Sequence, residues 1–200
     1  VDGVVLNPAD EPVVAHDDTF TGETEHSLIV GKVTDNDEVP DLLRDVTLLS
    51  PPTGGTLALN GDGSFTYDPG QDFDSLAEGE SATVSFDYQA ADADHDTDTA
   101  TARLTITGTN DAPQISGGVV SGAVEEDAQL TASGQLTATD VDHGAILAWS
   151  VVGSGEGAYG SIAVDGTGQW TYTLDNNSAA VQALAEGESL SEQFTIQVSD

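Results

Sequence analysis

Asn60-Gly61-Asp62-Gly63-Ser64-Phe65-Thr66-Tyr67 is followed, 105 residues later, by the similar stretch Asp165-Gly166-Thr167-Gly168-Gln169-Trp170-Thr171-Tyr172. Each copy opens with Asn, Asp and Gly, which accept positive φ most readily, so each predicts the turn of a β-hairpin. The aromatic residues that follow alternate with polar ones, and this period of two is typical of a strand with one buried face. A repeat of about 100 residues is too long for a solenoid unit and indicates globular modules in tandem.

The repetition extends over most of the chain. Leu76-Ala77-Glu78-Gly79-Glu80-Ser81 recurs at residues 184–189, and Asp10-Glu11-Pro12 has a counterpart at residues 111–113. Short alternating stretches separated by Gly, Asp and Asn favour seven strands per module, which is the pattern of a Greek-key sandwich. We therefore predict an all-β protein of two tandem Greek-key β-sandwich modules, with one turn of helix over residues 179–185.

The repeat also predicts the domain boundaries. Residues 1–12 are a linker and the remnant of a preceding repeat, residues 13–109 form module 1, residues 110–113 form a linker and residues 114–200 form module 2. Module 2 stops where module 1 continues into its last strand, so that strand is expected to be missing. One hypothesis is that residues 1–6 pair with the open edge of module 2 in a neighbouring molecule. The alternative is a chain cut inside a longer array of repeats.

Thirty-six acidic residues against three basic ones give the chain a formal net charge of −33. The acids gather in runs such as residues 35–37, 92–96 and 140–142, and each run offers several oxygens to one cation. Calcium takes about six to eight oxygen ligands and tolerates irregular geometry, so calcium is the expected cofactor. The alternative is a solvated acidic surface of the salt-adapted kind. Repulsion from phosphates argues against nucleic acids and anionic membranes as partners.

Other kinds of chemistry lack the residues they need. No cysteine is present, which excludes disulfides, thiol catalysis and cysteine zinc sites. The four histidines fall in different loops without metal-ligand spacing, and no serine-nucleophile motif, phosphate-binding loop or dinucleotide fingerprint occurs. No apolar run reaches the roughly 18–20 residues of a membrane helix. We expect neither an enzyme nor insertion into a membrane, and we expect the chain to be part of a longer protein.

A Greek-key sandwich brings loops that are distant in sequence to the same end of a module, and this predicts two acidic clusters. The first is expected at the junction of the modules, from Glu23 or Glu25, Glu78 or Glu80, Asn110, Asp111, Asp140, Asp142 and Asp200. The second is expected at the opposite end of module 1, from Asp10, Asp35, Asp37, Asp92 and Asp94. Carboxylates crowded in a partly desolvated volume repel one another, and calcium would turn that repulsion into attraction.

Several motifs together resemble a known family. Residues 138–144, with Asp140 and Asp142 ahead of a strand, resemble the Asp-x-Asp motif of cadherin repeats, and residues 110–113 resemble their calcium-binding linker. Residues 60–67, 76–80 and 107–113 look like the VCBS and cadherin-like repeats of very large bacterial surface adhesins of the RTX type. The resemblance covers essentially the whole chain and implies immunoglobulin-like or cadherin-like sandwiches.

The resemblance also implies a function and a location. It implies calcium-rigidified extender modules of a secreted adhesin, exported by a one-step type I system to the bacterial cell surface for adhesion and biofilm formation. It makes Asp140 and Asp142 ligands from module 2, and Asn110 and Asp111 ligands from the linker. It also makes Glu78 or Glu80 a ligand from module 1. The implied partners are calcium and the neighbouring repeats of the same chain, while another part of the adhesin binds a surface or host-cell ligand.

A module that binds a carbohydrate or protein ligand is the alternative from another functional class. An exposed face carrying Trp149, Tyr159 or Trp170 would favour this alternative. A spacer module is expected to keep such rings in its core, because aromatic residues at alternating strand positions pack inward.

Overall fold

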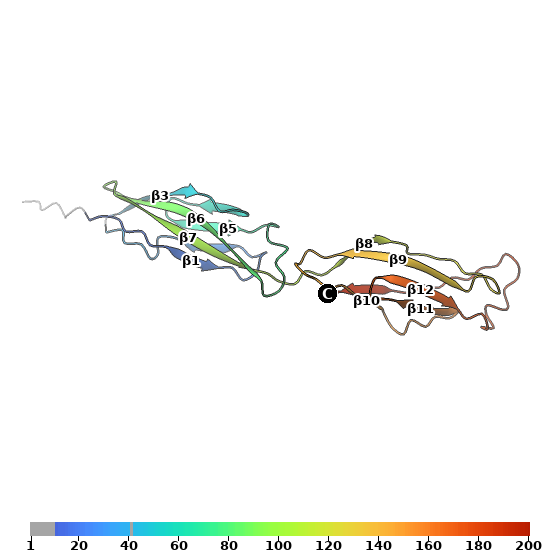
Figure 1. Cartoon of the computed structure of the whole chain (residues 1–200). Coiled ribbons are helices and arrows are strands. Elements are labelled where there is room, and N and C mark those ends of the chain that lie inside the picture. Colours follow the sequence, from blue (N-terminus) through green and yellow to red (C-terminus); the bar gives the residue numbers. More distant parts are fainter. Residues whose placement is uncertain (1–10, 41) are drawn as a thin grey trace, which may run out of the picture. The chain divides into compact units, whose positions relative to one another are not determined.

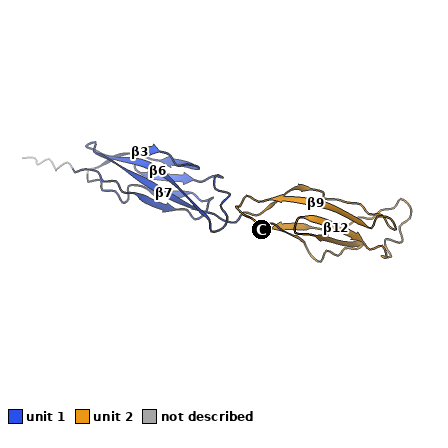
Figure 2. Cartoon of the chain, viewed as in Figure 1, with its two compact units in different colours: residues 1–110 blue, residues 111–200 orange. Residues whose placement is uncertain are grey.

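The computed structural model describes residues 11–40 and 42–200. The chain forms two compact units, unit 1 (Val1–Asn110) and unit 2 (Asp111–Asp200), coloured blue and orange in Figure 2. The described residues contain strands and turns but no helix, so the all-β prediction is confirmed and no described helix is available to cross a bilayer. The predictions for residues 1–6 and for Asp10 lie outside the described residues.

Unit 1 is a sandwich of two sheets (Figure 1). One sheet has the order β1-β7-β6-β3, with β1 parallel to β7 and the other neighbours antiparallel, and the second sheet has the order β2-β5-β4. Neighbours that are not consecutive in the chain, such as β3 and β6, give the crossed connections of a Greek key. The strands are β1 (Asp18–Thr21), β2 (Ile29–Lys32), β3 (Leu43–Ser50), β4 (Thr56–Leu59), β5 (Ser64–Asp68), β6 (Ser81–Asp92) and β7 (Thr97–Thr107).

The core of unit 1 follows from the alternation along β6 and β7. Every second residue is buried from Val84 to Asp92 on β6 and from Ala100 to Ile106 on β7. Phe65 of the facing sheet packs edge-on against Phe86, with 5.5 Å between the ring centroids. The same alternation places the two polar residues Tyr88 and Asp92 on the inward face of β6.

The stretch that occurs twice forms the predicted hairpin in both units. In unit 1 it joins β4 to β5, with Gly63 at φ 84° and a 2.9 Å hydrogen bond from the Asn60 amide to the Ser64 carbonyl. In unit 2 it joins β11 (Gly160–Val164) to β12 (Gln169–Leu174), with Gly168 at φ 83°. Glycine is needed at these two positions because a side chain at such a φ strains the backbone.

Unit 2 contains a four-stranded sheet of order β11-β12-β9-β8 and a pair formed by β10 and β13. The bounds of these other strands are β8 (Gln114–Gly118), β9 (Thr131–Thr139), β10 (Ala148–Val151) and β13 (Ile196–Ser199). Trp170 is only 5% exposed, and its Nε1 donates to the Val119 carbonyl at 2.6 Å. Gly134 makes room for the indole, because a Cβ at this position would lie 2.8 Å from the ring. Trp170 is therefore a core residue.

The helical turn predicted over residues 179–185 is wrong. Residues 179–183 form consecutive turns, with hydrogen bonds from the Val181 and Gln182 amides to the Ser178 carbonyl. A single bond from residue i+4 to residue i does not offset the entropy of ordering a helical nucleus, so the segment remains a chain of turns.

The separate cores predict that a core substitution in unit 1 affects unit 1 alone. In chelator, Leu104→Ala is expected to lower the free energy of unfolding of unit 1 by about 2–5 kcal/mol, because Leu104 is fully buried. Far-UV circular dichroism during urea unfolding measures this loss. Both tryptophans, Trp149 and Trp170, lie in unit 2, so the fluorescence transition should not move. Leu49→Ala, at an exposed site, is the control, and a shifted fluorescence midpoint in Leu104→Ala would contradict separate cores.

Candidate metal centres

Unit 2 brings three carboxylates together at the ends of two strands. Asp140 and Asp142 follow β9, and Asp200 follows β13, which belongs to the other sheet. Each of the three offers an oxygen, and these oxygens lie within 4.8 Å of one another. The Asp142 amide donates to Asp140 Oδ1 at 2.9 Å, so the backbone itself holds one carboxylate in place. We call this group the unit 2 cluster.

Two oxygens of the unit 2 cluster are buried without a donor. Asp142 is only 7% exposed, and neither Asp142 Oδ1 nor Asp140 Oδ2 accepts a hydrogen bond. The other oxygen of Asp142, Oδ2, accepts a 2.8 Å bond from the Asp111 amide at the start of the unit. Buried carboxylate oxygens without donors are destabilising, and a divalent cation would stabilise them by supplying positive charge. An all-oxygen donor set of this kind fits calcium.

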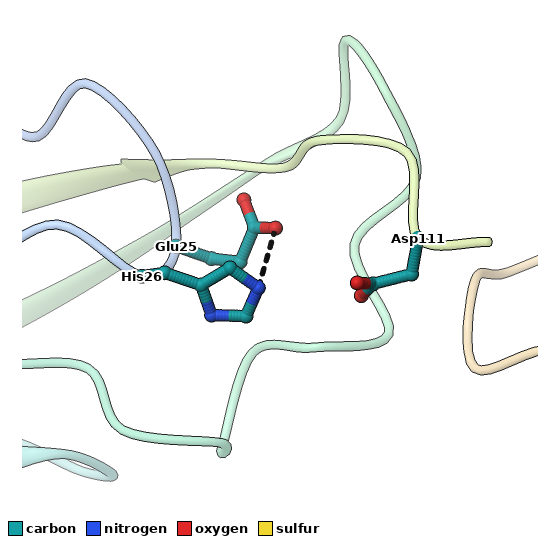
Figure 3. Close-up of side chains that lie close together, drawn as sticks. All are labelled: Glu25, His26 and Asp111. Carbon is teal, nitrogen blue, oxygen red and sulfur yellow. Dashed lines mark ion pairs between the residues drawn. The ribbon is translucent and has the colours of Figure 1, made fainter.

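Unit 1 has a second carboxylate group at the end where the chain leaves it. Glu25 is fully buried; its Oε1 accepts a 2.5 Å bond from the Thr109 hydroxyl, and its Oε2 has no donor. His26 Nε2 lies 3.5 Å from Glu25 Oε1, the ion pair marked in Figure 3, and His26 Nδ1 lies 3.8 Å from Asp74 Oδ1. Asp74 Oδ1 is likewise buried without a hydrogen-bond donor. Figure 3 also draws Asp111, which follows Thr109 and Asn110 in the chain.

Sequence reasoning did not identify Asp74 or His26. Asp74 corresponds to Gln182 in the second copy of the motif at residues 76–81, so the repeat comparison gave no acidic signal there. Glu78 and Glu80, which the sequence suggested as ligands, are exposed. Glu80 Oε2 accepts a 3.1 Å bond from the Ala77 amide, and Glu188 makes the same bond to Ala185 in unit 2. The matching bonds indicate that this glutamate stabilises a turn in both units.

The acidic residues at the opposite end of unit 1 are less closely grouped than those of the unit 2 cluster. Asp92 is fully buried; its Oδ1 accepts bonds from the Asp94 and Asp96 amides, and its Oδ2 has no donor. Asp35 and Asp94 are exposed. Within the described residues, Asp35, Asp37, Asp92 and Asp94 do not include three ligand atoms as close together as those of the unit 2 cluster.

Asp37 is held by protein donors. Its Oδ1 accepts a 2.8 Å bond from the His16 amide, and both its oxygens lie 3.1 Å from the Tyr88 hydroxyl. The same hydroxyl lies within 3.2 Å of Asp18 Oδ2 and of the His16 and Val33 carbonyls. Burial raises the pKa of Asp18 to about 6, and it also raises the pKa of Asp37. One phenolic proton therefore serves several acceptors that are partly desolvated.

The aromatic rings do not form an exposed platform in the described part of the chain. Trp170 is buried, and Trp149 and Tyr159 are half-buried. The exposed aromatic face that would favour a carbohydrate-binding or protein-binding module is therefore not formed by these three residues.

Comparisons place the fold among cadherin-like domains. Residues 9–108 and 110–200 each match the model of the bacterial cadherin-like domain. Among solved structures, the EC1–4 fragment of PcdhgB3 aligns with a TM-score of 0.52 and 20% identity over 87% of this chain and 43% of that chain. The EC1–4 fragment of Drosophila N-cadherin aligns with a TM-score of 0.50 and 16% identity over 80% of this chain and 40% of that chain.

A third structure, the protocadherin gammaB7 EC3–6 fragment, gives a TM-score of 0.50 and 14% identity over 95% of this chain and 48% of that chain. Identities at this level show a shared fold. The chain spans less than half the length of each of these three structures. A search of curated proteins by sequence gave no match.

The raised pKa of Asp18 predicts a pH effect on unit 1. The folded protein binds this proton more tightly than the unfolded chain, so the penalty for a buried charge is present above about pH 6 and disappears as the pH falls toward 4. In chelator, Asp18→Asn should stabilise unit 1 by on the order of 1–3 kcal/mol at pH 7.5 and by much less at pH 4.5. Urea unfolding at the two pH values measures the difference.

Asp62→Asn is the control for this pH effect. A hydrogen bond from the Ser64 side chain lowers the pKa of Asp62, so this carboxyl stays ionised in both states over most of the range. The Asp62→Asn effect should therefore be nearly the same at pH 4.5 and at pH 7.5. An equally constant effect for Asp18→Asn would contradict the assignment of a buried charge to Asp18.

Proposed function

Because the chain belongs to the family of bacterial cadherin-like domains, we propose that its two units are extender modules of a bacterial surface adhesin and that calcium ions stiffen the joint between them. The family has the cadherin-like fold of extracellular adhesion proteins and is not an enzyme family. We also propose that the protein is extracellular and is exported by a type I system. Its role would be in adhesion and biofilm formation through a ligand-binding tip.

The main support for the proposal is that the buried side-chain polar atoms without a hydrogen-bond partner are all of one kind. Five buried side-chain polar atoms lack a hydrogen-bond partner in the described residues, and all five are carboxylate oxygens. They belong to Glu25, Asp74, Asp92, Asp140 and Asp142. Neutral polar atoms would be left unsatisfied as readily as carboxylates if packing defects were the cause. A set made only of anionic oxygens supports cation binding.

The linker connects the carboxylate groups of the two units through the chain itself. The Thr109 hydroxyl donates to Glu25 of unit 1, and the Asp111 amide donates to Asp142 of unit 2. Asn110 is the one residue between them. Bound calcium would supply positive charge to Glu25, Asp74, Asp140, Asp142 and Asp200. Fixing both carboxylate groups would restrict the backbone dihedrals of the linker, and this restriction is the proposed source of stiffness.

The donor set also suits the environment of an extracellular protein. Extracellular calcium modules bind with dissociation constants of roughly 10⁻⁴ to 10⁻³ M. Such sites fill outside the cell and empty at cytosolic calcium, so the joint would stay flexible until export. Neighbouring repeats of the same chain are the proposed partners, and another part of the adhesin would bind the surface or host-cell ligand.

Thermal unfolding distinguishes specific calcium sites from a salt-adapted acidic surface. Starting from chelator, calcium at about ten times the dissociation constant should stabilise each occupied unit by about 1.4 kcal/mol, which corresponds to roughly 5–10 °C in Tm. Magnesium should act more weakly, because it demands octahedral geometry and dehydrates reluctantly. Sodium chloride at matched ionic strength is the control. Equal stabilisation by sodium chloride would favour the salt-adapted alternative and contradict the proposal.

The unit 2 cluster has its own test in a double substitution. Asp140→Asn with Asp142→Asn keeps side-chain shape but removes two charges, so it should abolish most of the calcium-induced rise in Tm seen by tryptophan fluorescence. The small-angle scattering profile of the variant in calcium should change toward the profile of the parent in chelator. Glu156→Gln with Glu186→Gln removes the same charge from exposed sites of unit 2 and should behave like the parent. A double aspartate variant that keeps the parent's scattering profile in calcium would disprove the ligand assignment.

A further inference from the structure

The two units do not carry equivalent acidic residues at their N-terminal ends, although their sequences look alike. The strand registers pair Lys32 with Ser64 in unit 1 and Gln135 with Gln169 in unit 2. Ser64 and Gln169 occupy the same place in the repeated hairpin, so Lys32 corresponds to Gln135. Gly31 and Gly134 agree with this match, because a Cβ at either would strike the core aromatic ring of the hairpin strand, Phe65 or Trp170.

The structural match changes which acids correspond. Continuing from Lys32 and Gln135, Asp37 takes the place of Asp140, and Val39 takes the place of Asp142. Unit 1 therefore has an apolar residue where unit 2 has its most buried cluster carboxylate. Asp200, the third residue of the unit 2 cluster, corresponds to Asp92 in unit 1. This follows from counting on without a gap from the repeated motif at residues 76–81 and 184–189.

The same ungapped match pairs Tyr88 with Ile196. In unit 2, with isoleucine at this position, Asp140 Oδ2 is left without a donor. In unit 1 the Tyr88 hydroxyl lies 3.1 Å from both oxygens of Asp37. It therefore occupies the side of the carboxylate on which a cation bound by both oxygens would lie. Tyr88 is fully buried, so water does not compete for its proton.

We propose that the Tyr88 hydroxyl competes with calcium for Asp37 and thereby makes the N-terminal end of unit 1 a weaker calcium site than the unit 2 cluster. The inference rests on the proposed function, because it concerns the relative affinities of sites proposed to bind calcium. Asp92, buried and with one oxygen lacking a donor, still favours a cation at this end. The hydroxyl sets how much calcium is needed to fill it. The unit 2 cluster fills first as calcium rises, and the N-terminal end of unit 1 fills later.

A residue-resolved NMR titration of the full chain with calcium chloride tests this order. The His16 amide donates to Asp37 and the Asp94 amide donates to Asp92, so their shifts report unit 1. The Asp142 amide donates to Asp140 and reports unit 2. Tyr88→Phe removes only the hydroxyl. It should lower the calcium concentration for half-saturation at the unit 1 amides by about tenfold, the scale of outer-shell effects on metal affinity, and leave the unit 2 value unchanged.

Tyr67→Phe is the matched control, because Tyr67 is also fully buried but donates to the Gly54 carbonyl and to no carboxylate. A role limited to packing predicts that Tyr88→Phe weakens or does not change calcium binding, whereas competition predicts tighter binding. If Tyr88→Phe unfolds unit 1 by leaving Asp18 buried and unpaired, Asp18→Asn with Tyr88→Phe removes that charge and should give the same tenfold gain.

The outcomes separate this inference from the proposed function. A parent chain in which no amide responds to calcium overturns the proposed function and the inference with it. A response at Asp142, together with an unchanged or raised half-saturation at His16 and Asp94 in the hydroxyl-lacking variant that folds, overturns the inference alone. Earlier saturation of the unit 2 amide in the parent, with the difference between the two units narrowed about tenfold by Tyr88→Phe and kept by Tyr67→Phe, supports it.

Discussion

Carboxylates that are buried at the ends of the two sandwiches are the constraint on which the rest of the structure depends. Each is placed by a strand whose alternation carries it inward, as with Asp92 at the end of β6, or by a hydrogen bond from a backbone amide, as with Asp142, whose Oδ2 accepts from the Asp111 amide. Burial removes water from these oxygens while neighbouring acids repel them. The apolar and aromatic core between the sheets must hold the strand ends together against this repulsion.

The hairpins, the sandwich class and the aromatic core could be predicted from the sequence because they depend on local signals. Positive-φ residues at Asn60–Gly63 and the period of two after them act within a few residues. The turns at residues 179–183 were mistaken for a helix because the same short apolar spacing suits both. Acids directly after strands, such as Asp140 and Asp200, were also predictable, because strand ends of a sandwich meet at one edge.

The rest of the site depends on pairings across the sheets that local patterns do not encode. Asp74 was hidden because its repeat partner is Gln182, and Glu78 was favoured because its motif repeats, although the repeated feature is a turn stabilised by Glu80. Asp35-Asn36-Asp37 looks like Asp140-Val141-Asp142 in sequence, yet counting on from the strand registers makes Asp37 the counterpart of Asp140. Repetition in sequence therefore predicted the fold, whereas the burial and the hydrogen-bond partners of the acidic residues follow only from the folded structure.

The difference between the two units shows how domains of one fold can differ in the polar groups at their ends. The cores use the same positions, Phe65 and Trp170, each facing a glycine on the neighbouring strand. At the ends, a hydroxyl in unit 1 lies beside both oxygens of Asp37, whereas in unit 2 one oxygen of the corresponding Asp140, Oδ2, has no donor. A buried carboxylate can be stabilised by a hydrogen bond or by a cation, and exchanging one side chain on β6 or β13 changes which of the two is available.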